Sequence, residues 1–267
     1  MNSDHDDRKK IMGDLLTWVR HNESAGMEWF LDEGPAAAVE DTNNADPFDD
    51  LCTQFVTQVM PLIMSQPARP VRGSSAEDRV TALAALREEV QPCTACRLHE
   101  GRNATVFGSG NPDADVVFIG EAPGRDEDLQ GEPFVGRSGQ LLTKILAAIG
   151  YDRDEVFICN ILKCRPPNNR DPQADEVAAC EPYLKRQLDI LNPRVICCLG
   201  RVAAQTLLGT DASLKRLRET VHFYQGIPVM ATYHPAALLR NPSWKRETWN
   251  DVRKMRALVD TLKKGES

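Results

Sequence analysis

The amino-acid sequence predicts an α/β protein of three layers, α/β/α, in which helices cover both faces of a central, mostly parallel sheet of four strands. Short apolar segments alternate with longer segments of helical spacing, and this alternation is typical of parallel sheets. Of the 267 residues, 42% are hydrophobic and 27% are charged, which is the composition of an ordinary globular protein. No run approaches the ~18 consecutive apolar residues that a membrane helix needs, so we exclude a membrane-spanning protein.

The predicted elements begin at Ser75, which together with Asp78 resembles the N-terminus of a helix. The apolar stripe of this helix is Val80, Leu83, Leu86 and Val90. Apolar runs predict strands at residues 116–119, 156–161, 195–199, 221–224 and 229–233. Helical spacing predicts helices at residues 140–149 and 175–191, a short helix that ends at residue 208, and a closing helix at residues 243–264.

The carboxyl ends of the predicted strands indicate where a ligand would bind, because open α/β sheets bind ligands at that edge. Three segments follow predicted strands: residues 120–124 with the sequence GEAPG, residues 160–169, and residues 234–240. They are the least ordinary stretches of the sequence, and we expect them to converge.

The N-terminal third carries all of the excess negative charge. Residues 1–78 hold 15 acidic and 6 basic side chains (net −9), so the whole-chain charge of −7 leaves 24 acidic and 26 basic side chains (net +2) for residues 79–267. A net charge of +2 permits a nucleic-acid partner. We predict an acidic extension at residues 1–74, disordered or loosely helical around residues 9–20 and 51–63, and a main domain at residues 75–267. An arm that binds a protein partner is the alternative for the extension.

Eight cysteines are present, and the N-terminus lacks the layout of a secretory signal, so we expect a cytoplasmic protein with reduced thiols. Cys93 and Cys96 form a C-x2-C pair, and Cys164 and Cys180 follow at a wider spacing. Four such thiolates hold zinc or an iron–sulfur cluster, and the wide second spacing favours the cluster while leaving zinc open. A redox pair is less favoured, because the C-x2-C motif follows a helix. The remaining cysteines are predicted to pack in the interior: Cys52, Cys159, Cys197 and Cys198.

Polar and aromatic side chains in the three segments suit a planar ligand. Glu121 and Glu127 supply carboxylates beside a loop whose glycines let the backbone approach a ligand closely. Phe134 either stacks on such a ligand or belongs to the core. Asn160 offers an amide that both donates and accepts hydrogen bonds, which suits the edge of a nucleobase. His234 closes the last strand, and taken alone it is more often structural than catalytic.

Taken together, the segments GEAPGRDED, GEPFVGRSGQLL, NILKCRPPNNRDP and HPAALLRNP resemble the uracil-DNA glycosylase superfamily, and most closely its iron–sulfur-containing family 4. The resemblance covers residues 85–264 and leaves the extension outside. It implies the three-layer fold of that superfamily and a [4Fe–4S] cluster on Cys93, Cys96, Cys164 and Cys180. It also implies base excision repair, in which uracil is flipped out of DNA and its N-glycosidic bond is hydrolysed to leave an abasic site.

The resemblance further implies how uracil is recognised and released. Phe134 would stack on the flipped ring, and Asn160 would bind its O4 and N3–H. His234, as a neutral donor, would stabilise the charge that develops on O2. Glu121 and Asn169 would position or activate the attacking water.

Other residues would shape the pocket or contact DNA. Glu127 would lie near C5 of uracil, where the methyl group of thymine must be refused, and Gly120 and Ala122 would line the pocket. Ala122 stands where other branches of the superfamily carry a water-activating aspartate, so the general base is the least certain assignment. The cations expected at DNA phosphates are Arg165, Arg170 and Arg240, with Arg137 and Lys163 as further candidates.

We expect a monomer in a bacterial or archaeal cytosol that acts on single- and double-stranded DNA and turns over, because no basic insertion follows Gly136. Two alternatives remain at this point. The first is a non-catalytic or redox-sensing iron–sulfur protein that binds DNA on the same fold. The second is a zinc-stabilised hydrolase of small nucleotides.

Overall fold

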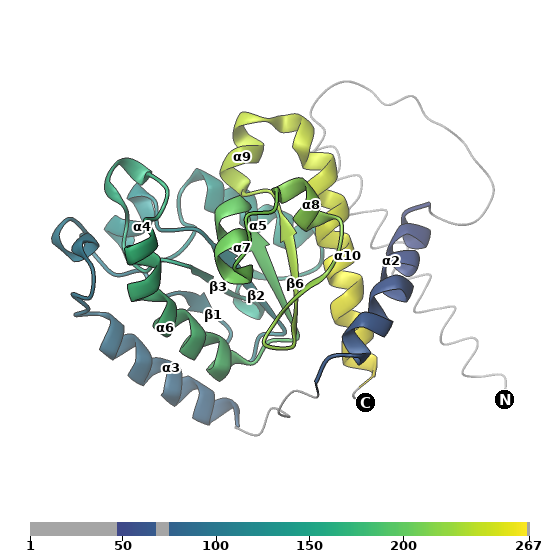
Figure 1. Cartoon of the computed structure of the whole chain (residues 1–267), viewed down its shortest axis with the longest axis horizontal. Helices are drawn as coiled ribbons and strands as arrows, with labels where there is room; N and C mark the ends of the chain where they lie inside the picture. The colour runs from purple at the N-terminus through teal and green to yellow at the C-terminus, as the bar shows by residue number, and fades with distance from the viewer. Residues whose placement is uncertain (1–46, 68–74, 266–267) are drawn as a thin grey trace. The chain divides into compact units, whose positions relative to one another are not determined.

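A six-stranded mixed sheet forms the centre of the part of the chain that this computed structural model describes, residues 47–67 and 75–265 (Figure 1). The strand order is β1-β3-β2-β4-β6-β5. The strands are β1 (Ser109–Gly110), β2 (Val116–Gly120), β3 (Phe157–Asn160), β4 (Val195–Leu199), β5 (His222–Tyr224) and β6 (Ile227–Thr232). The four central strands β3, β2, β4 and β6 run parallel, and the two edge strands pair antiparallel with their neighbours.

The α/β class is confirmed, but the predicted number of strands is wrong, because the sheet has six and not four. The four central strands are buried along their whole length, so they appear in the sequence as apolar runs. Of the two edge strands, the half-buried β5 lies within the strand predicted at residues 221–224, whereas β1 has only two residues and carries no such signal. The β5–β6 hairpin turns at Gln225 and Gly226, which both have positive φ (49° and 77°), as a two-residue type I′ turn requires.

Helices cover both faces of the sheet. Successive side chains of a strand point to opposite faces, and every residue of the central strands is buried. The helices are α2 (Pro47–Met64), α3 (Ala76–Val90), α4 (Arg125–Gln130), α5 (Arg137–Ala148), α6 (Ala174–Leu191), α7 (Arg201–Leu208), α8 (Leu214–Arg218), α9 (Pro235–Arg240) and α10 (Lys245–Lys264). Short 3-10 helices lie at Arg97–Glu100, Arg153–Glu155, Pro167–Asn169 and Pro242–Trp244. No helix in the described ranges combines the length and apolarity needed to cross a bilayer.

Helix α3 begins where the sequence predicts. The Asp78 backbone N–H donates to Ser75 Oγ (3.1 Å), and the Ser75 N–H donates to Asp78 Oδ2 (3.0 Å), which is a complete capping box. The predicted stripe is correct except at Val80, which is 51% exposed. The neighbouring Arg79 is buried instead, because its guanidinium forms an ion pair with Asp113 at 2.6 Å.

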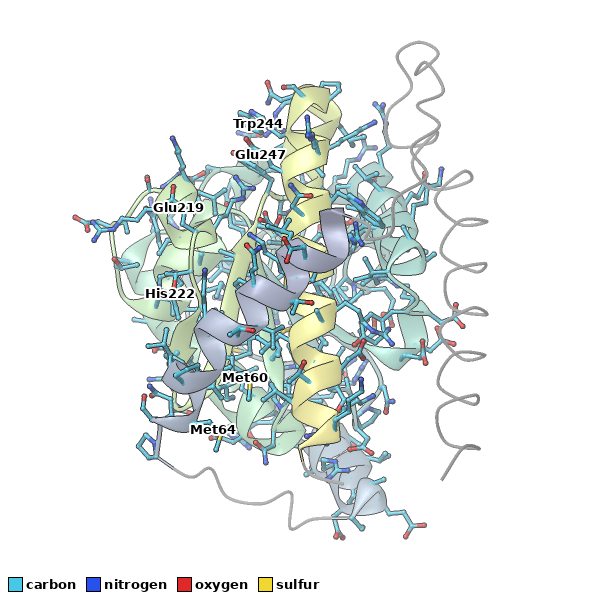
Figure 2. The ribbon with its side chains drawn as sticks, turned by 90° about the vertical axis from the view of Figure 1, so that its right-hand side faces the viewer. Met60, Met64, Glu219, His222, Trp244 and Glu247 are labelled. Atoms are coloured by element: carbon cyan, nitrogen blue, oxygen red, sulfur yellow. The ribbon has the colours of Figure 1, made fainter. Side chains whose placement is uncertain are left out.

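Helix α2 lies across α10 (Figure 2) and contains the second apolar stripe expected in the extension. Phe55 and Val59 are buried, and Lys254 Nζ of α10 lies 5.4 Å from the centre of the Phe55 ring. This part of the predicted extension is therefore helical and packed. The other stripe, at residues 9–20, falls outside the described residues, and a boundary at residue 74 remains a prediction.

Truncation of Phe55 tests the packing of α2. Phe55→Ala is expected to lower the free energy of unfolding by about 3 kcal/mol, because it removes a buried aromatic side chain. Urea denaturation followed by circular dichroism measures the change. Gln58→Ala, at an exposed position of the same helix, serves as the control and should stay within about 0.5 kcal/mol of the parent. Equal stability of the parent and Phe55→Ala would contradict the docking of α2 on α10.

Candidate functional site

A cavity of about 390 Å³, open to solvent, lies beyond the carboxyl ends of the central strands. All three segments nominated by the sequence line it. The lining residues that the sequence singled out are Glu121, Ala122, Glu127, Phe134, Asn160, Asn169, Arg170, His234 and Arg240. The structure thus brings nine of the eleven predicted catalytic, substrate-binding and DNA-binding residues to one place; the other two are Gly120 and Arg165.

Gly120 lies beneath the cavity floor, at the end of β2. A Cβ atom at this position would lie 2.3 Å from Asn160 Oδ1 and 2.7 Å from Phe134 Cζ, so glycine is needed for these two side chains to meet. Phe134 itself has a positive φ of 53° and is 6% exposed. Its ring is buried at the cavity wall, with its centre 5.5 Å from that of the His234 ring.

Asn160 ends β3 and is 2% exposed, yet its side-chain Oδ1 is buried without a hydrogen-bond partner in the described structure. A buried, unpaired amide oxygen is costly unless a ligand supplies the donor. The Asn160 backbone carbonyl, in contrast, accepts a hydrogen bond from Lys163 Nζ at 2.8 Å. Asn160 is therefore a cavity-lining residue with a held main-chain carbonyl and an unpaired side-chain acceptor.

Glu121 follows β2 and is the carboxylate with the most perturbed proton affinity in the cavity. Burial raises the pKa of Glu121 to about 7, with a further raising effect from Asp171 and an opposing effect from Arg201. Asp171 also lines the cavity and forms an ion pair with Arg201 Nη2 at 3.1 Å. Near neutral pH Glu121 therefore exchanges a proton readily, as a general base requires.

His234 caps α9 in its neutral form. Burial, followed by the positive charge of Arg240, lowers the pKa of His234 to about 4. Its Nδ1 accepts a hydrogen bond from the Ala236 N–H at 3.1 Å, so the ring proton lies on Nε2. The imidazole can then donate one hydrogen bond without carrying charge.

A network behind β6 holds the segment that leads to His234. The Tyr233 ring lies between Trp244, stacked at 4.6 Å, and the Arg218 guanidinium, 4.2 Å from its centre. Arg218 Nε binds Asp251 at 2.7 Å, and the same carboxylate accepts from Thr232 Oγ1 at 2.7 Å. Residues on both sides of β6's end are thereby tied to α10.

Glu127 holds the loop that carries Phe134. It is 8% exposed, and its Oε1 accepts from the backbone N–H groups of Val135 and Gly136, both at 3.0 Å. The carboxylate thus faces the cavity while anchoring the turn that places the aromatic ring.

The predicted DNA-contacting cations have different surroundings. Arg165 lies beside the cavity and donates from Nε to Asn169 Oδ1 at 2.7 Å. Arg170 is engaged in a two-pronged ion pair with the buried Glu176. Arg240 is exposed on α9 at the cavity rim. The interpretation of Lys163 as a phosphate contact is wrong, because this side chain is 1% exposed.

Sequence reasoning missed two lining residues outside the three nominated segments: Ser138 and Asp171. Asp171 matters most, because it influences the pKa of Glu121. Its place in the same loop as Asn169 was the available signal, and its carboxylate could have been considered with Glu121.

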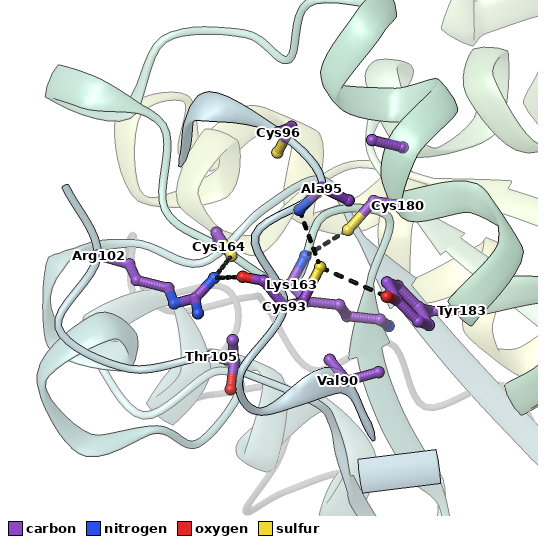
Figure 3. Close-up of a pocket in the computed structure, with 11 residues that line it drawn as sticks. Val90, Cys93, Ala95, Cys96, Arg102, Thr105, Lys163, Cys164, Cys180 and Tyr183 are labelled. Carbon is purple, nitrogen blue, oxygen red and sulfur yellow. Dashed lines mark hydrogen bonds between the residues drawn. The ribbon is translucent and has the colours of Figure 1, made fainter. Parts of the chain in front are cut away.

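The four cysteines predicted as ligands line a second, small cavity of about 10 Å³ (Figure 3). Cys93 and Cys96 follow α3, Cys164 follows β3, and Cys180 lies on α6. Within the described ranges, no three His, Cys, Asp or Glu side chains gather closely enough to hold one metal ion.

Hydrogen-bond donors reach these sulfur atoms from several sides (Figure 3). Arg102 Nη1 lies 3.2 Å from Cys164 Sγ, and Tyr183 Oη lies 3.4 Å from Cys93 Sγ. The Lys163 backbone N–H donates to Cys180 Sγ at 3.3 Å. Such donors stabilise negative charge on sulfur. Cys159, Cys197 and Cys198 do not line this cavity and are buried in the sheet, as predicted.

Comparison with known proteins adds an independent finding. A family model described as the uracil DNA glycosylase superfamily matches residues 107–253. The chain is 48% identical over 175 residues to the type-4 uracil-DNA glycosylase of Archaeoglobus fulgidus, a match that covers 62% of this chain and 88% of that protein. It is 44% identical over 178 residues to the type-4 uracil-DNA glycosylase of Thermotoga maritima, covering 65% of this chain and 93% of that protein. The residues matched by the family model include every segment that lines the larger cavity.

Proposed function

The chain belongs to the uracil DNA glycosylase superfamily, and on that premise we propose that it is a DNA-repair enzyme that releases uracil from DNA by hydrolysing the N-glycosidic bond. The observation that carries the proposal is the unpartnered Oδ1 of Asn160, a residue that lines the cavity together with Phe134 and a neutral His234. The hydrolysis would leave an abasic site.

Recognition of the base follows from Asn160 and Phe134. A nucleotide must leave the duplex before an enzyme reaches its glycosidic bond, and the flipped ring would lie against Phe134. The N3–H of uracil would donate to Asn160 Oδ1, and the Asn160 amide N–H would donate to O4. Cytosine presents an acceptor at N3 and a donor at C4, so both hydrogen bonds would be replaced by repulsion. Gly120 and Ala122 leave space beneath and beside the ring.

Release of uracil creates negative charge on its O2, and His234 would stabilise that charge. Its Nε2–H is the donor, since Nδ1 is occupied by the Ala236 N–H. A neutral imidazole keeps its proton during the reaction and needs no rearrangement as the charge develops.

Attack by water would depend on Glu121 and Asn169. With a pKa of about 7, Glu121 accepts a proton from water under physiological conditions. Asn169 would hold that water from the opposite loop, where Arg165 fixes its side-chain oxygen. Glu127 would exclude the methyl group of thymine by keeping the Phe134 loop close to C5.

The second cavity fits a [4Fe–4S] cluster bound by Cys93, Cys96, Cys164 and Cys180. The supporting observations are the four thiols that line one cavity and the hydrogen-bond donors directed at three of them. When bound, the cluster would supply a rigid cross-link between the segment after α3, the loop after β3, and α6.

Loss of one cysteine tests the cluster. Cys164→Ala is expected to lose most of the iron and acid-labile sulfide of the purified protein and to lower its Tm, because the cross-link is broken. Elemental analysis and visible absorption measure the content. The matched control is Cys197→Ala, a buried cysteine outside the cavity, which should keep its iron. Bound zinc without iron in the parent protein would contradict the cluster assignment.

Contacts with DNA would come from Arg165 and Arg240 at the cavity rim, with Arg170 contributing through its position beside Asn169. Such contacts would make binding weaken with salt. We further propose activity on single and paired strands, a monomeric enzyme in a bacterial or archaeal cytoplasm, and a protein partner for the N-terminal extension.

The direct test is incubation of the purified protein with oligonucleotides containing U·G, U·A or single-stranded uracil, followed by alkali. Strand cleavage at the uracil position is the expected result, and an oligonucleotide with cytosine or thymine at that position is the control. Absence of cleavage by protein with its full metal content would refute the function and favour a binding protein on this fold.

A further inference from the structure

Lys163 lies between the two cavities and is buried to 1% exposure. It lines the cysteine cavity, where its backbone N–H donates to Cys180 Sγ (Figure 3). Its Nζ donates to the backbone carbonyl of Asn160 at 2.8 Å. One residue therefore contacts both a proposed cluster ligand and the main chain of the residue proposed to recognise uracil.

The buried ammonium of Lys163 lacks a carboxylate partner. Among residues 47–67 and 75–265, no Asp or Glu forms an ion pair with it, and its charge acts on the Cys159 and Cys180 thiols. A buried cation is costly without a counter-charge. Four thiolates around a [4Fe–4S] core leave net negative charge in the adjacent cavity, and that charge would stabilise the ammonium.

The hydrogen bond from Lys163 Nζ to the Asn160 backbone carbonyl comes from a side chain and not from a neighbouring strand of the sheet. After Asn160 the chain leaves β3, and the next two N–H groups, of Ile161 and Leu162, bond to the Gly120 and Glu121 carbonyls. The Asn160 carbonyl accepts its hydrogen bond from Lys163 Nζ. Without that donor the buried carbonyl is unpaired, and the peptide that orients the Asn160 side chain can rotate.

We propose that Lys163 is a positioning residue that links the charge of the cysteine-bound cluster to the orientation of Asn160 in the uracil pocket. This inference rests on the proposed function and on the proposed cluster. The cluster would then do more than cross-link the chain, because Lys163, the cation beside it, holds Asn160, the residue proposed to recognise the base.

Three substitutions separate the charge of Lys163 from its hydrogen bond. Lys163→Met removes both, Lys163→Gln keeps an N–H donor without charge, and Lys163→Arg keeps both. The control is Lys185→Met, which removes an exposed lysine paired with Glu181 on α6. For each full-length protein, the measurements are iron content, the midpoint potential of the cluster, kcat and KM for uracil release, and the affinity for free uracil by calorimetry.

The midpoint potential of the cluster is expected to depend on the charge of the side chain at position 163. A nearby cation favours the reduced, more negative cluster, so the potential should move to more negative values in Lys163→Met and Lys163→Gln and stay near the parent in Lys163→Arg and Lys185→Met. The kcat and the affinity for uracil are expected to depend on whether the side chain at position 163 keeps a hydrogen-bond donor. Lys163→Met should lose about tenfold in kcat and in uracil affinity, while Lys163→Gln and Lys163→Arg recover part of both.

Each outcome tests one of two links: the one between the cluster charge and Lys163, called the charge link, or the one between Lys163 and the position of Asn160, called the positioning link. Equal potentials in the parent, Lys163→Gln and Lys163→Arg would overturn the charge link. Unchanged kcat and uracil affinity in Lys163→Met would overturn the positioning link. If Lys163→Met does not fold, the comparison of Lys163→Gln with Lys163→Arg still decides the charge link, and Lys163→Ala, which also lacks a donor, decides the positioning link. If the parent protein released no uracil, the proposed function would fail, whereas the potentials and the calorimetry would still decide the role of Lys163.

Discussion

Replacing Asn160 by alanine is expected to lower kcat/KM for uracil release by a factor on the order of 10²–10³, because the base loses its two recognition hydrogen bonds. The effect should appear with an unchanged fold, since the buried Oδ1 of Asn160 makes no hydrogen bond within the described structure and its removal leaves no partner unsatisfied. Single-turnover release from a single-stranded uracil oligonucleotide measures the change without a contribution from product release.

A buried amide elsewhere supplies the matched control. Gln187 on α6 is also fully buried with an unpartnered side-chain oxygen, but it does not line the uracil cavity. Gln187→Leu should alter stability, since its Nε2 bonds to the Phe107 carbonyl, while leaving the rate of uracil release near the parent value. Equal losses in the two variants would mean that Asn160 acts through the fold and not through the base.

Glu121→Gln is expected to cause the second large loss in the rate of uracil release. The rate is expected to fall by a factor on the order of 10²–10⁴, because glutamine cannot accept the proton of the attacking water. In the parent enzyme the ionised form is the active one, so activity should be present above pH 7 and should decline as the pH falls through the Glu121 pKa of about 7. A parent profile without this acid limb would exclude Glu121 as the base.

Neighbouring charges should move that limb in opposite directions. Asp171 raises the pKa of Glu121, so Asp171→Asn should shift the acid limb to lower pH, and Arg201→Gln, which removes a lowering charge, should shift it to higher pH.

The raised pKa of Glu121 also has a consequence for the stability of the fold. A carboxyl whose folded pKa exceeds its usual 4.5 destabilises the fold once it ionises, so Glu121→Gln should raise the Tm at pH 8 and leave it little changed at pH 4.

Local sequence signals predicted the elements whose residues share one environment. The central strands are buried on both faces, and α6 and α10 carry long apolar stripes, so their positions were found within two residues. The half-buried edge strand β5 lies within the strand predicted at residues 221–224, whereas the two-residue edge strand β1 carries no such signal and is absent from the predicted strands.

Residue types predicted which side chains meet in the site better than they predicted how each side chain is buried or paired. The loops after the strands were expected to converge, and nine of eleven predicted residues meet in one cavity. Burial of a cation cannot be inferred from residue type, however, so Lys163 was taken for a surface lysine. The ion pair of Arg170 with Glu176 also escaped prediction, because it depends on how the loop folds back over α6.

The contact between Gly120, Asn160 and Phe134 constrains how this enzyme can evolve. Since any side chain at position 120 would collide with both neighbours, neither a larger nor a more polar residue can be accommodated there unless the amide or the ring withdraws. Adaptation to a different damaged base would therefore have to proceed through the rim, at positions such as Ala122 or Ser138, while the depth of the pocket stays invariant.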